Sequence, residues 1–373
     1  MMAKTILITG GAGFIGSRLA DELLEHGCRV RALDCLAEQV HGPGMNRPSY
    51  LNPEVELVVG DVRDPSAVRR ALAGVDAVYH FAATVGVGQS MYEISRYVDV
   101  NNCGTAVLLQ VLIERPVERL IVASSMSVYG EGLYRRPDGT VCSGVERNMV
   151  QLKARRWELV HEDGGILTPI PTPENKTPSL ASIYALSKYD QEKMCLLVGN
   201  AYGMPAVALR FFNVYGPRQS LSNPYTGVLA IFASRLLNGN PPLINEDGFQ
   251  MRDFVSVHDV AQACRLALQV PEAAGKIFNI GSGTRCTIRE VALRMAAVLG
   301  KEAIEPRITN KYRVGDIRHC FADISHARAV LKYEPGIKLE EGIRELARWL
   351  ERQVALDRGD QAHAELDARG LTV

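Results

Sequence analysis

The chain has 373 residues, of which 47% are hydrophobic and 23% are charged. A polypeptide of this length and apolar content can bury a large core, which excludes a disordered protein. The 42 Lys and Arg residues equal the 42 Asp and Glu residues in number. No overall positive field therefore attracts nucleic acid or an anionic membrane surface, and the expected partner is a small molecule.

Neither a targeting segment nor a metal or disulfide framework is expected. The first strand-like run follows a single Lys and soon reaches a glycine turn, so it is too short for the apolar part of a signal peptide. No run approaches the roughly twenty apolar residues of a membrane span. The eight Cys are scattered without a CxxC pair or a neighbouring His cluster. This pattern indicates reduced thiols in a cytoplasmic protein and no metal site.

The first half of the chain alternates short β-branched runs with helical periodicity, which is typical of βαβ units around a parallel sheet. Strands are expected at 4–10, 28–34, 55–61, 77–83, 119–125 and 205–211, and helices at 15–25, 65–72 and 97–114. Two later strand-like runs are RDFVSV at 252–257 and GKIFNIGS at 275–282. They predict that the chain returns to the sheet before a helical C-terminus.

A glycine-rich turn follows the first expected strand, with Gly10, Gly13 and Gly16 spaced G-x-x-G-x-x-G where a helix opens. The first glycine permits the tight turn, the second lets backbone approach a pyrophosphate, and the third lets the helix pack on the strand. The start of that helix, at Phe14 and Ile15, then faces the negative charge. The predicted fold class is therefore α/β, with a Rossmann-type doubly wound parallel sheet that binds a dinucleotide.

A carboxylate at the end of the second expected strand favours NAD over NADP. Asp34 lies roughly twenty residues beyond the glycines, where it would accept hydrogen bonds from the adenosine ribose diol and repel a 2′-phosphate. The alternative is a simple turn residue. Asp61 and Val62 close the third strand, at a position suited to the adenine edge. Ala82 and Ala83 follow the fourth strand, where small side chains would admit the cofactor.

A phenol and an ammonium group are expected on one face of a helix, because Tyr184 and Lys188 stand four residues apart. A phenol, with an ordinary pKa of about 10, is a poor base at neutral pH, but a nearby cation favours its ionised form. Ser124, Ser125 and Ser127 follow a sheet strand, at the edge where open α/β sheets bind ligands. An isolated Tyr-x-x-x-Lys is usually structural; together with these hydroxyls it indicates an active site.

With these motifs the chain resembles an extended short-chain dehydrogenase/reductase, in the group of NAD-dependent nucleotide-sugar epimerases and dehydratases. The resemblance covers nearly the whole chain, through GGAGFIG, GDVRD, HFAA, NNCGT, SSMSVYG, YALSK, RFFNVYGPRQ, RDFVSVHDVA, FNIGSG and RVGDIRHCFAD. It implies a catalytic set of Ser125, Tyr184 and Lys188, with Asn101 supporting the lysine. The expected cofactor-binding residues are then Gly10, Gly13, Phe14, Ile15, Gly16, Asp34, Asp61, Val62, Ala82, Ala83, Asn101, Tyr184, Lys188 and Phe211.

The resemblance also implies a substrate-binding side. Phe211 and Asn213 would line the nicotinamide and diphosphate region. Arginines in matching motifs would bind the substrate diphosphate, because the planar guanidinium gives paired hydrogen bonds; solvated surface arginines are the alternative. The implied substrate-binding residues are Ser125, Ser127, Asn213, Arg252, Arg313, Asp316 and Arg318.

The residues after the catalytic hydroxyl favour one reaction of the family. The family's dehydratases have an Asp-Glu pair there, whereas this chain has Met126 and Ser127. Water elimination then lacks its acid and base. The remaining reaction needs only the Tyr, which removes a sugar hydroxyl proton while hydride passes to NAD and later returns to the other face of the keto sugar. The net reaction is epimerisation with no cofactor consumed.

Among the epimerases, HFAATVGVGQSMYE and the long segment with RRW and LTPIPTPENKTPSLASIYALSK most resemble the dTDP-L-rhamnose 4-epimerases, which form dTDP-6-deoxy-L-talose through a 4-keto sugar. A UDP-hexose 4-epimerase, a CDP-sugar 2-epimerase and a non-catalytic NAD-binding protein are the alternatives. Some relatives carry a Cys pair where this chain has His161, Glu162 and Asp163, so no metal is expected. Helices near Tyr97 and at Tyr184 resemble those that pair two family subunits, which implies a homodimer.

The stretch from Gly130 to Pro178 interrupts the alternation of strands and helices, because it is rich in Gly, Pro and charged residues. Such a segment is typically a functional loop or lid, and an insertion without a role is the alternative. We expect an NAD-binding domain at 1–210 to which the chain returns at about 253–283. A smaller substrate-binding domain would comprise 211–252 and 284–357, and 358–373 would be a frayed tail.

Overall fold

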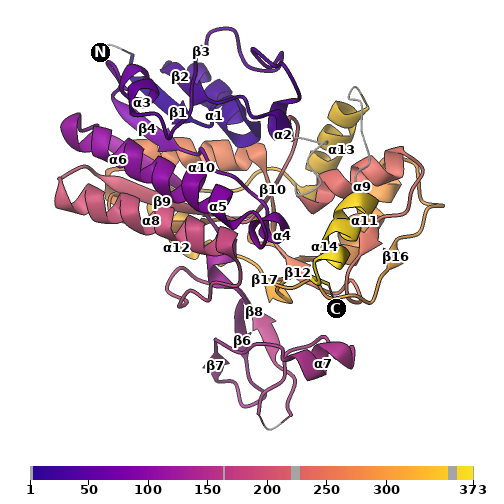
Figure 1. The fold of residues 1–373 in the computed structure, drawn as a ribbon. Helices are drawn as coiled ribbons and strands as arrows, with labels where there is room; N and C mark the ends of the chain where they lie inside the picture. The colour runs from indigo at the N-terminus through magenta and orange to yellow at the C-terminus, as the bar shows by residue number, and fades with distance from the viewer. Residues whose placement is uncertain (1–2, 163, 220–226, 352–358, 373) are drawn as a thin grey trace.

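A computed structural model describes residues 3–162, 164–219, 227–351 and 359–372 (Figure 1). Seven parallel strands form the central sheet in the order β14-β9-β5-β4-β1-β2-β3. This confirms the predicted Rossmann-type α/β fold. The strands are β1 (Thr5–Thr9), β2 (Arg29–Asp34), β3 (Glu56–Val59), β4 (Ala77–His80), β5 (Arg119–Ser125), β9 (Ala206–Phe211) and β14 (Ile277–Ile280).

Helices cover both faces of the sheet, which explains why its central strands are continuously apolar. On one face, α1 (Phe14–Glu25) packs against α10 (Val257–Gln269) through a core that includes Leu19 and Val260. On the other face lie α3 (Pro65–Ala71), α6 (Gly104–Glu114) and α8 (Ile183–Ala201) (Figure 1). The sheet order changes direction between β1 and β4, and in such folds ligands bind at this switch point.

The expected helix at 97–114 contains an irregular turn. The short helix α5 (Ile94–Tyr97) continues into a π-helical turn at Val98–Cys103, and this turn continues into α6. A π turn inserts an extra residue and often lies beside a functional site. Here it sits next to α8, the helix that carries Tyr184 and Lys188.

A second body of helices and small sheets packs beside the central sheet. Its core joins Phe232 of α9 (Val228–Leu237), Met295 of α11 (Ile288–Val298) and Leu346 of α13 (Leu339–Leu350). A capping box of Thr287 and Glu290 starts α11. The remaining elements are α2 (Glu38–His41), α4 (Val87–Ser90), α12 (Ser325–Leu331), β10 (Asn213–Tyr215), β11 (Leu243–Ile244), β12 (Met251–Arg252), β13 (Phe254–Ser256), β15 (Cys286–Thr287), β16 (Arg307–Ile308) and β17 (His319–Cys320), with 3-10 turns at Met126–Tyr129 and Pro271–Ala273.

Only one of the two expected returns to the central sheet occurs. β14 pairs with β9 as predicted. The prediction for RDFVSV is wrong, because β13 pairs with β10 in a separate two-stranded sheet. Since β14 already occupies the position beside β9, the RDFVSV segment leads into α10, which covers the sheet instead of extending it.

The stretch from Gly130 to Pro178 folds as a small unit, drawn below the sheet in Figure 1. A three-stranded sheet and one helix surround a core of Tyr134, Cys142, Leu159 and Leu167. Its elements are β6 (Leu133–Arg135), β7 (Val141–Cys142), β8 (Thr168–Ile170) and α7 (Met149–Lys153). None of its described residues lines the main cavity, so the structure gives the unit no role as a lid.

The described part of the tail, for which the sequence predicts a frayed end, contains a helix. Residues 359–368 form α14 (Gly359–Ala368), and Thr372 bridges to Arg313. Leu366 is buried. Within the described residues, none of the helices has the length and apolarity needed to cross a membrane, and no cluster of His, Cys, Asp and Glu could hold a metal ion.

Candidate active site

A cavity of about 810 Å³ lies between the carboxyl edge of the central sheet and the second body. The predicted cofactor-binding and substrate-binding residues line this cavity, with two exceptions, Asn101 and Arg318. Segments that are far apart in the sequence therefore meet at the switch point between β1 and β4. The glycine turn, the serines at the end of β5 and the Tyr-x-x-x-Lys helix together predict that these segments share one cavity.

The glycine turn leaves no room for side chains. Gly10 has φ +70°, and a Cβ there would lie 2.9 Å from the backbone nitrogen of Ala82. A Cβ on Gly16 would overlap the carbonyl oxygen of Gly10. Gly13 is the N-cap residue of α1, and it provides no side chain to cap the helix start. The first backbone N–H groups of α1 are thus available for a pyrophosphate, as an NAD site requires.

Asp34 is held at the edge of the cavity by backbone and side-chain contacts. Its Oδ2 accepts a hydrogen bond from the Ala12 amide at 3.0 Å, and Oδ1 accepts one from the Leu36 amide at 2.9 Å. His41 Nε2 lies 3.6 Å from the same carboxylate, and the Tyr50 hydroxyl donates to the Ala12 carbonyl at 3.0 Å. Each carboxylate oxygen retains a further acceptor direction for a ribose hydroxyl. The loop that carries His41 and Tyr50 has no sequence motif, so both residues were missed.

Where β3 ends beside the cavity, Asp61 is paired with Arg63. The guanidinium donates to Oδ1 at 3.0 Å and to Oδ2 at 2.7 Å, and these hydrogen bonds hold the pKa of the Asp61 carboxyl below its usual range. Asp61 is therefore ionised and can accept from an exocyclic amine. Val62 lies beside it in the cavity wall.

Tyr184 lies in the first turn of α8, which starts where the Ser182 hydroxyl accepts from the Ala185 amide at 3.1 Å. A hydrogen bond joins its phenol to Ser125. Burial raises the pKa of Tyr184, and the bond to Ser125 partly offsets that rise. Ser127 in turn donates from its hydroxyl to Ser125 Oγ at 2.9 Å. Ser125 at the end of β5 and Ser127 just after it thus orient the phenol toward the cavity.

Lys188 is buried and follows Tyr184 by about one turn of α8, and burial lowers its pKa to about 8. Its Nζ donates to Gln191 Oε1 at 2.7 Å. The Gln191 amide donates to Thr105 Oγ1 at 2.9 Å and lies 3.2 Å from the ring of His80, whose pKa burial lowers to about 3. A neutral polar network therefore fixes the lysine without adding a competing charge.

The side chain of Asn101, which the family resemblance assigns to support of the lysine, hydrogen-bonds to Thr84 and Ser187. Its amide donates to the Thr84 carbonyl at 3.1 Å and to Ser187 Oγ at 2.9 Å, and its Oδ1 accepts from the Thr84 amide at 2.7 Å. The π turn directs this side chain at the loop after β4. Asn101 therefore joins that loop to α8, and Gln191 contacts the lysine instead. No motif distinguishes Gln191 in the sequence.

The substrate-side arginines divide into two groups. Arg252 and Arg313 line the cavity. Arg252 donates to the carbonyls of Met251, Ile317 and Arg318, which orients it, and Arg313 is paired with Asp316 at 2.6 Å.

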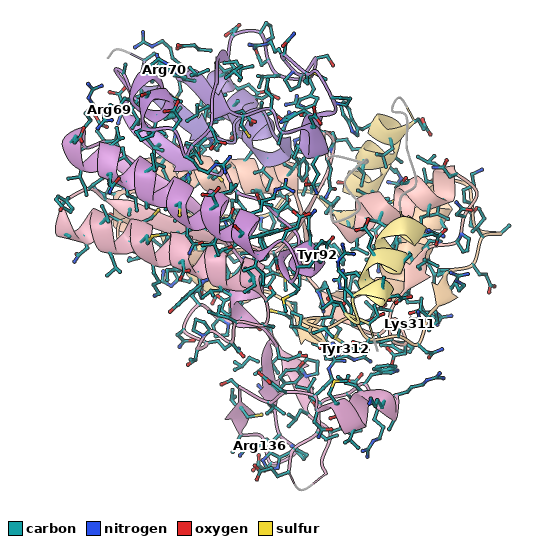
Figure 2. All side chains as sticks on the ribbon, viewed as in Figure 1. Arg69, Arg70, Tyr92, Arg136, Lys311 and Tyr312 are labelled. Carbon is teal, nitrogen blue, oxygen red and sulfur yellow. The ribbon has the colours of Figure 1, made fainter. Side chains whose placement is uncertain are left out.

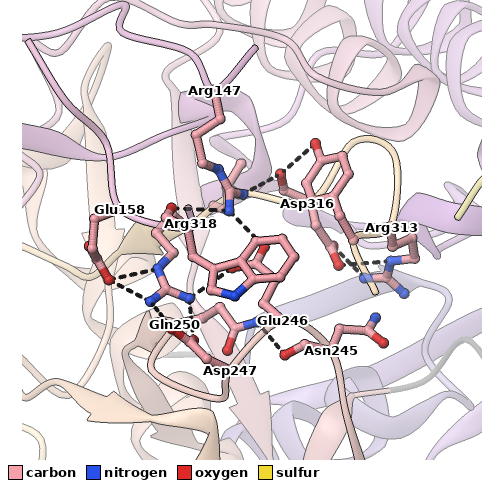
Figure 3. Close-up of polar contacts among 12 residues, drawn as sticks. Arg147, Glu158, Asn245, Glu246, Asp247, Gln250, Arg313, Asp316 and Arg318 are labelled. Carbon is pink, nitrogen blue, oxygen red and sulfur yellow. Dashed lines mark hydrogen bonds and ion pairs between the residues drawn. The ribbon is translucent and has the colours of Figure 1, made fainter. Parts of the chain in front are cut away.

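Arg318 does not reach the cavity, which contradicts its predicted contact with the substrate diphosphate. Its side chain is fully buried and donates to Glu158, Glu246 and Asp247 (Figure 3). These bonds use all five N–H donors of the guanidinium. The sequence spacing in RVGDIR does not reveal this, because Glu158 belongs to the Gly130 to Pro178 unit.

Several polar atoms in the cavity wall have no partner among the described residues. They include the amide oxygens of Asn213, Gln219 and Gln250. A buried acceptor without a partner costs roughly 1 to 3 kcal/mol, so such atoms mark positions where a ligand would complete the bonding. Asn213 was predicted from the RFFN motif. The two glutamines were missed, although Gln219 ends the RFFNVYGPRQ motif and Gln250 lies two residues before RDFVSVHDVA.

Comparisons with known proteins agree with this geometry. The model of the NAD dependent epimerase/dehydratase family matches residues 6–146 and 164–281. The chain belongs to this family. It is 38% identical to a dTDP-L-rhamnose 4-epimerase of Burkholderia thailandensis, over 94% of this chain and 96% of that one.

Solved structures extend the likeness to the whole fold. A UDP-glucose 4-epimerase of Thermotoga maritima, crystallised with UDP-glucose, has a TM-score of 0.76 and 30% identity, covering 93% of this chain and 99% of that one. The UDP-glucose 4-epimerase of Thermus thermophilus, in complex with NAD, has a TM-score of 0.74 and 30% identity, covering 94% and 100%. The cofactor of this family is NAD, and the glycine turn and Asp34 fit it.

Proposed function

We propose that this protein is an NAD-dependent nucleotide-sugar 4-epimerase that interconverts dTDP-L-rhamnose and dTDP-6-deoxy-L-talose through a transient 4-keto sugar. One observation carries the reaction type. The Tyr184 phenol is bonded to Ser125 and lines the cavity with Lys188, while the two positions after Ser125 hold Met126 and Ser127. The site has a base for a sugar hydroxyl, but it lacks the acid and base pair that dehydration needs.

The chain's own residues manage the proton. Tyr184 would take the proton of the 4-hydroxyl group as the carbon–hydrogen bond at carbon 4 breaks, and Ser125 would hold that oxygen in place. Lys188, positively charged below a pKa of about 8, favours the phenolate form at neutral pH. Bound NAD supplies the hydride acceptor and, when oxidised, a further positive charge. After the keto sugar turns its other face, Tyr184 returns the proton to the oxygen at carbon 4.

The substrate nucleotide would lie against the second body. Arg252 and Arg313 provide donors for the diphosphate, since an Arg fork matches phosphate oxygens. The unpartnered oxygens of Gln219 and Gln250 can accept from an N–H of the base or an O–H of the sugar. Similarity to the Burkholderia dTDP-L-rhamnose 4-epimerase supports dTDP-L-rhamnose as the sugar nucleotide.

The test supplies dTDP-L-rhamnose, UDP-galactose and a CDP-dideoxy sugar separately to the purified protein with NAD, and follows the anomeric proton signals by NMR. We expect a 6-deoxy-L-talose signal from the first substrate only. Conversion of UDP-galactose to UDP-glucose without any talose product would assign the protein to the UDP-hexose 4-epimerases. Epimerisation at carbon 2 of the CDP sugar would favour the other alternative, and no turnover of any of them would support a non-catalytic NAD-binding protein.

We also propose that the protein is a cytoplasmic homodimer. Large apolar side chains are exposed on neighbouring helices: Ile94 of α5, Val98 of the π turn, and Leu186 and Leu197 of α8. A second copy of the same helices would cover them, as a symmetric four-helix contact requires. Light scattering at micromolar concentration should give twice the monomer mass of 40.9 kDa; a monomer mass would contradict the proposal.

A further inference from the structure

The C-terminal segment, residues 359–372, is anchored on the central-sheet side of the cavity. The Tyr92 hydroxyl donates to Glu365 Oε2 at 3.3 Å, and the Arg369 guanidinium lies 4.2 Å from the centre of the Tyr92 ring. A cation over an aromatic face is attracted to the ring. Tyr92 follows α4 in the chain, so the segment is attached next to the loop after β4.

The same segment is anchored on the second body. Lys311 Nζ donates to Asp367 Oδ2 at 2.8 Å, and the Val314 amide donates to the Leu371 carbonyl at 2.9 Å. Figure 2 shows Tyr92 and Lys311 on opposite sides of α14. The C-terminal segment therefore spans from one side of the cavity to the other.

Leu366 is the residue that the segment places against the cavity. It is 4% exposed and lies in the cavity wall with Val87 and Gly88 of α4. A Cβ built on Gly88 would lie 3.4 Å from Leu366 Cδ2 and 3.9 Å from Arg313 Cδ. Because Gly88 has no side chain, the methyl groups of Leu366 occupy the space above it and make this wall apolar.

This apolar wall adjoins the catalytic residues. A Cβ built on Gly315 would lie 3.1 Å from the Ala181 carbonyl and 3.8 Å from Val87 Cγ1. Ala181 shortly precedes Tyr184 in the chain, and α4 contacts α8, so Val87 lies near the start of α8. Leu366 lies over Gly88, the next residue of α4. In a 4-epimerase, carbon 4 of the sugar lies at the tyrosine. Carbon 6 is attached to carbon 5, the neighbour of carbon 4, and must lie close by.

We propose that the C-terminal segment forms one wall of the sugar site and that Leu366 selects sugars with an apolar group at carbon 6. This proposal rests on the 4-epimerase function proposed above. A methyl group would pack against Leu366 and Val87, whereas a 6-hydroxyl would lose its hydrogen bonds with water there. A 6-carboxylate would be worse still, because its charge would lose water beside the apolar side chains of Leu366 and Val87.

The test compares dTDP-L-rhamnose with dTDP-L-mannose, which differs from it only by a 6-hydroxyl. kcat/KM for each is measured in the wild type, in Leu366→Gln and in Leu293→Gln, a control at an exposed leucine of α11 that does not line the cavity. We expect the wild type to favour the 6-deoxy sugar. Leu366→Gln can hydrogen-bond the 6-hydroxyl, so the preference should fall about tenfold or more, while NAD affinity and the control stay unchanged.

Leu366→Ala is measured in parallel, because it adds no polar group and keeps the test valid should the glutamine variant fold poorly. It should raise KM for dTDP-L-rhamnose and leave NAD affinity unchanged. The proposal is overturned if both variants fold, as judged by thermal unfolding, and keep the wild-type KM and the wild-type preference.

If the proposed function is wrong, the experiment gives a result that differs from failure of the Leu366 proposal. In that case the wild type leaves dTDP-L-rhamnose unchanged, and the same variants are compared on UDP-D-galactose and its 6-deoxy counterpart, UDP-D-fucose. If the variants change the preference between these two sugars, Leu366 is part of the sugar site even though the substrate is a UDP-hexose. If the preference is the same as in the wild type, the proposal that Leu366 forms part of the sugar site is contradicted as well.

Discussion

The two halves of the cavity are built differently. The cofactor half consists of turns that directly follow parallel strands, so that Gly10, Asp34 and Asp61 each end or follow a strand of one sheet. The substrate half joins α4, the region around Arg313 and the C-terminal segment, which are far apart in the chain. Cofactor recognition can therefore be traced to local motifs, whereas substrate recognition depends on how distant segments pack together.

Removing the phenol oxygen of Tyr184, which lies where the two halves of the cavity meet, should have the largest effect on the rate of epimerisation. Tyr184→Phe deletes the group that moves the proton and little packing volume, so kcat for epimerisation should fall by about a hundredfold or more. NAD should stay bound, because the glycine turn and Asp34 are untouched. The matched control is Tyr97→Phe, since that ring packs edge-on against Tyr184 at 6.4 Å but does not line the cavity. Near wild-type turnover by Tyr184→Phe would exclude it as the base.

Replacing Lys188, in the same helix as Tyr184, tests whether α8 contributes to NAD binding as well as to catalysis. Lys188→Ala should abolish activity and also weaken NAD binding, because the lysine lines the same cavity as the glycine turn and Asp34. Calorimetric titration with NAD measures the second effect. If Lys188→Ala bound NAD as tightly as Tyr184→Phe does, the lysine would act on the phenol alone.

In the substrate half, Arg318 should matter for stability rather than for binding. Arg318→Met leaves Glu246 buried without one of its two cations, the other being Arg147. Breaking a buried charge pair in this way costs about 3 to 5 kcal/mol. Urea unfolding should show this loss, while the exposed Arg307→Met control should not. A raised KM with unchanged stability would instead restore Arg318 as a substrate ligand.

The comparison also shows what the sequence could reveal. The alternation of strands and helices predicted the sheet. Nearly all of the site residues predicted from the motifs line the cavity, although they form only part of its wall. Arg318 was misassigned because its partner Glu158 comes from a unit some 160 residues earlier in the chain. Leu366 and Gln191 were missed for a related reason: a leucine or glutamine in a helix has many ordinary roles, and only packing shows which side chain it faces.

The preference for NAD over NADP should depend on one carboxylate, that of Asp34. In Asp34→Ser the ribose diol loses a charged acceptor and a 2′-phosphate loses its repulsion, so the preference for NAD over NADP should narrow about tenfold or more. Calorimetry with each dinucleotide measures the ratio. Asp61→Asn is the control, because the adenine is common to both cofactors and both affinities should fall alike. An unchanged ratio in Asp34→Ser would remove Asp34 from the ribose site.

The smallest expected effect is on stability at low pH, and it depends on Glu158, which joins the Gly130 to Pro178 unit to the rest of the protein. Burial would raise the pKa of Glu158, but hydrogen bonds from His319 and Arg318 outweigh it and lower the pKa to about 2, against 4.5 for a free carboxyl. A carboxyl whose pKa is lower in the folded state stabilises the fold above its unfolded pKa. This contribution is complete above pH 4.5 and is lost as the pH falls toward about 2.

Glu158→Gln should therefore reduce the free energy of unfolding most at neutral pH, and the difference from wild type should shrink as the pH is lowered below 4.5. Because the Glu158 side chain is 39% exposed, we expect solvent screening to limit the difference to about 1 kcal/mol. Urea unfolding between neutral and acidic pH measures it. Repeating the exchange in Arg318→Met should give a smaller pH dependence, since one of the two groups that lower the pKa is gone. An equal difference at every pH would mean that Glu158 contributes packing rather than charge.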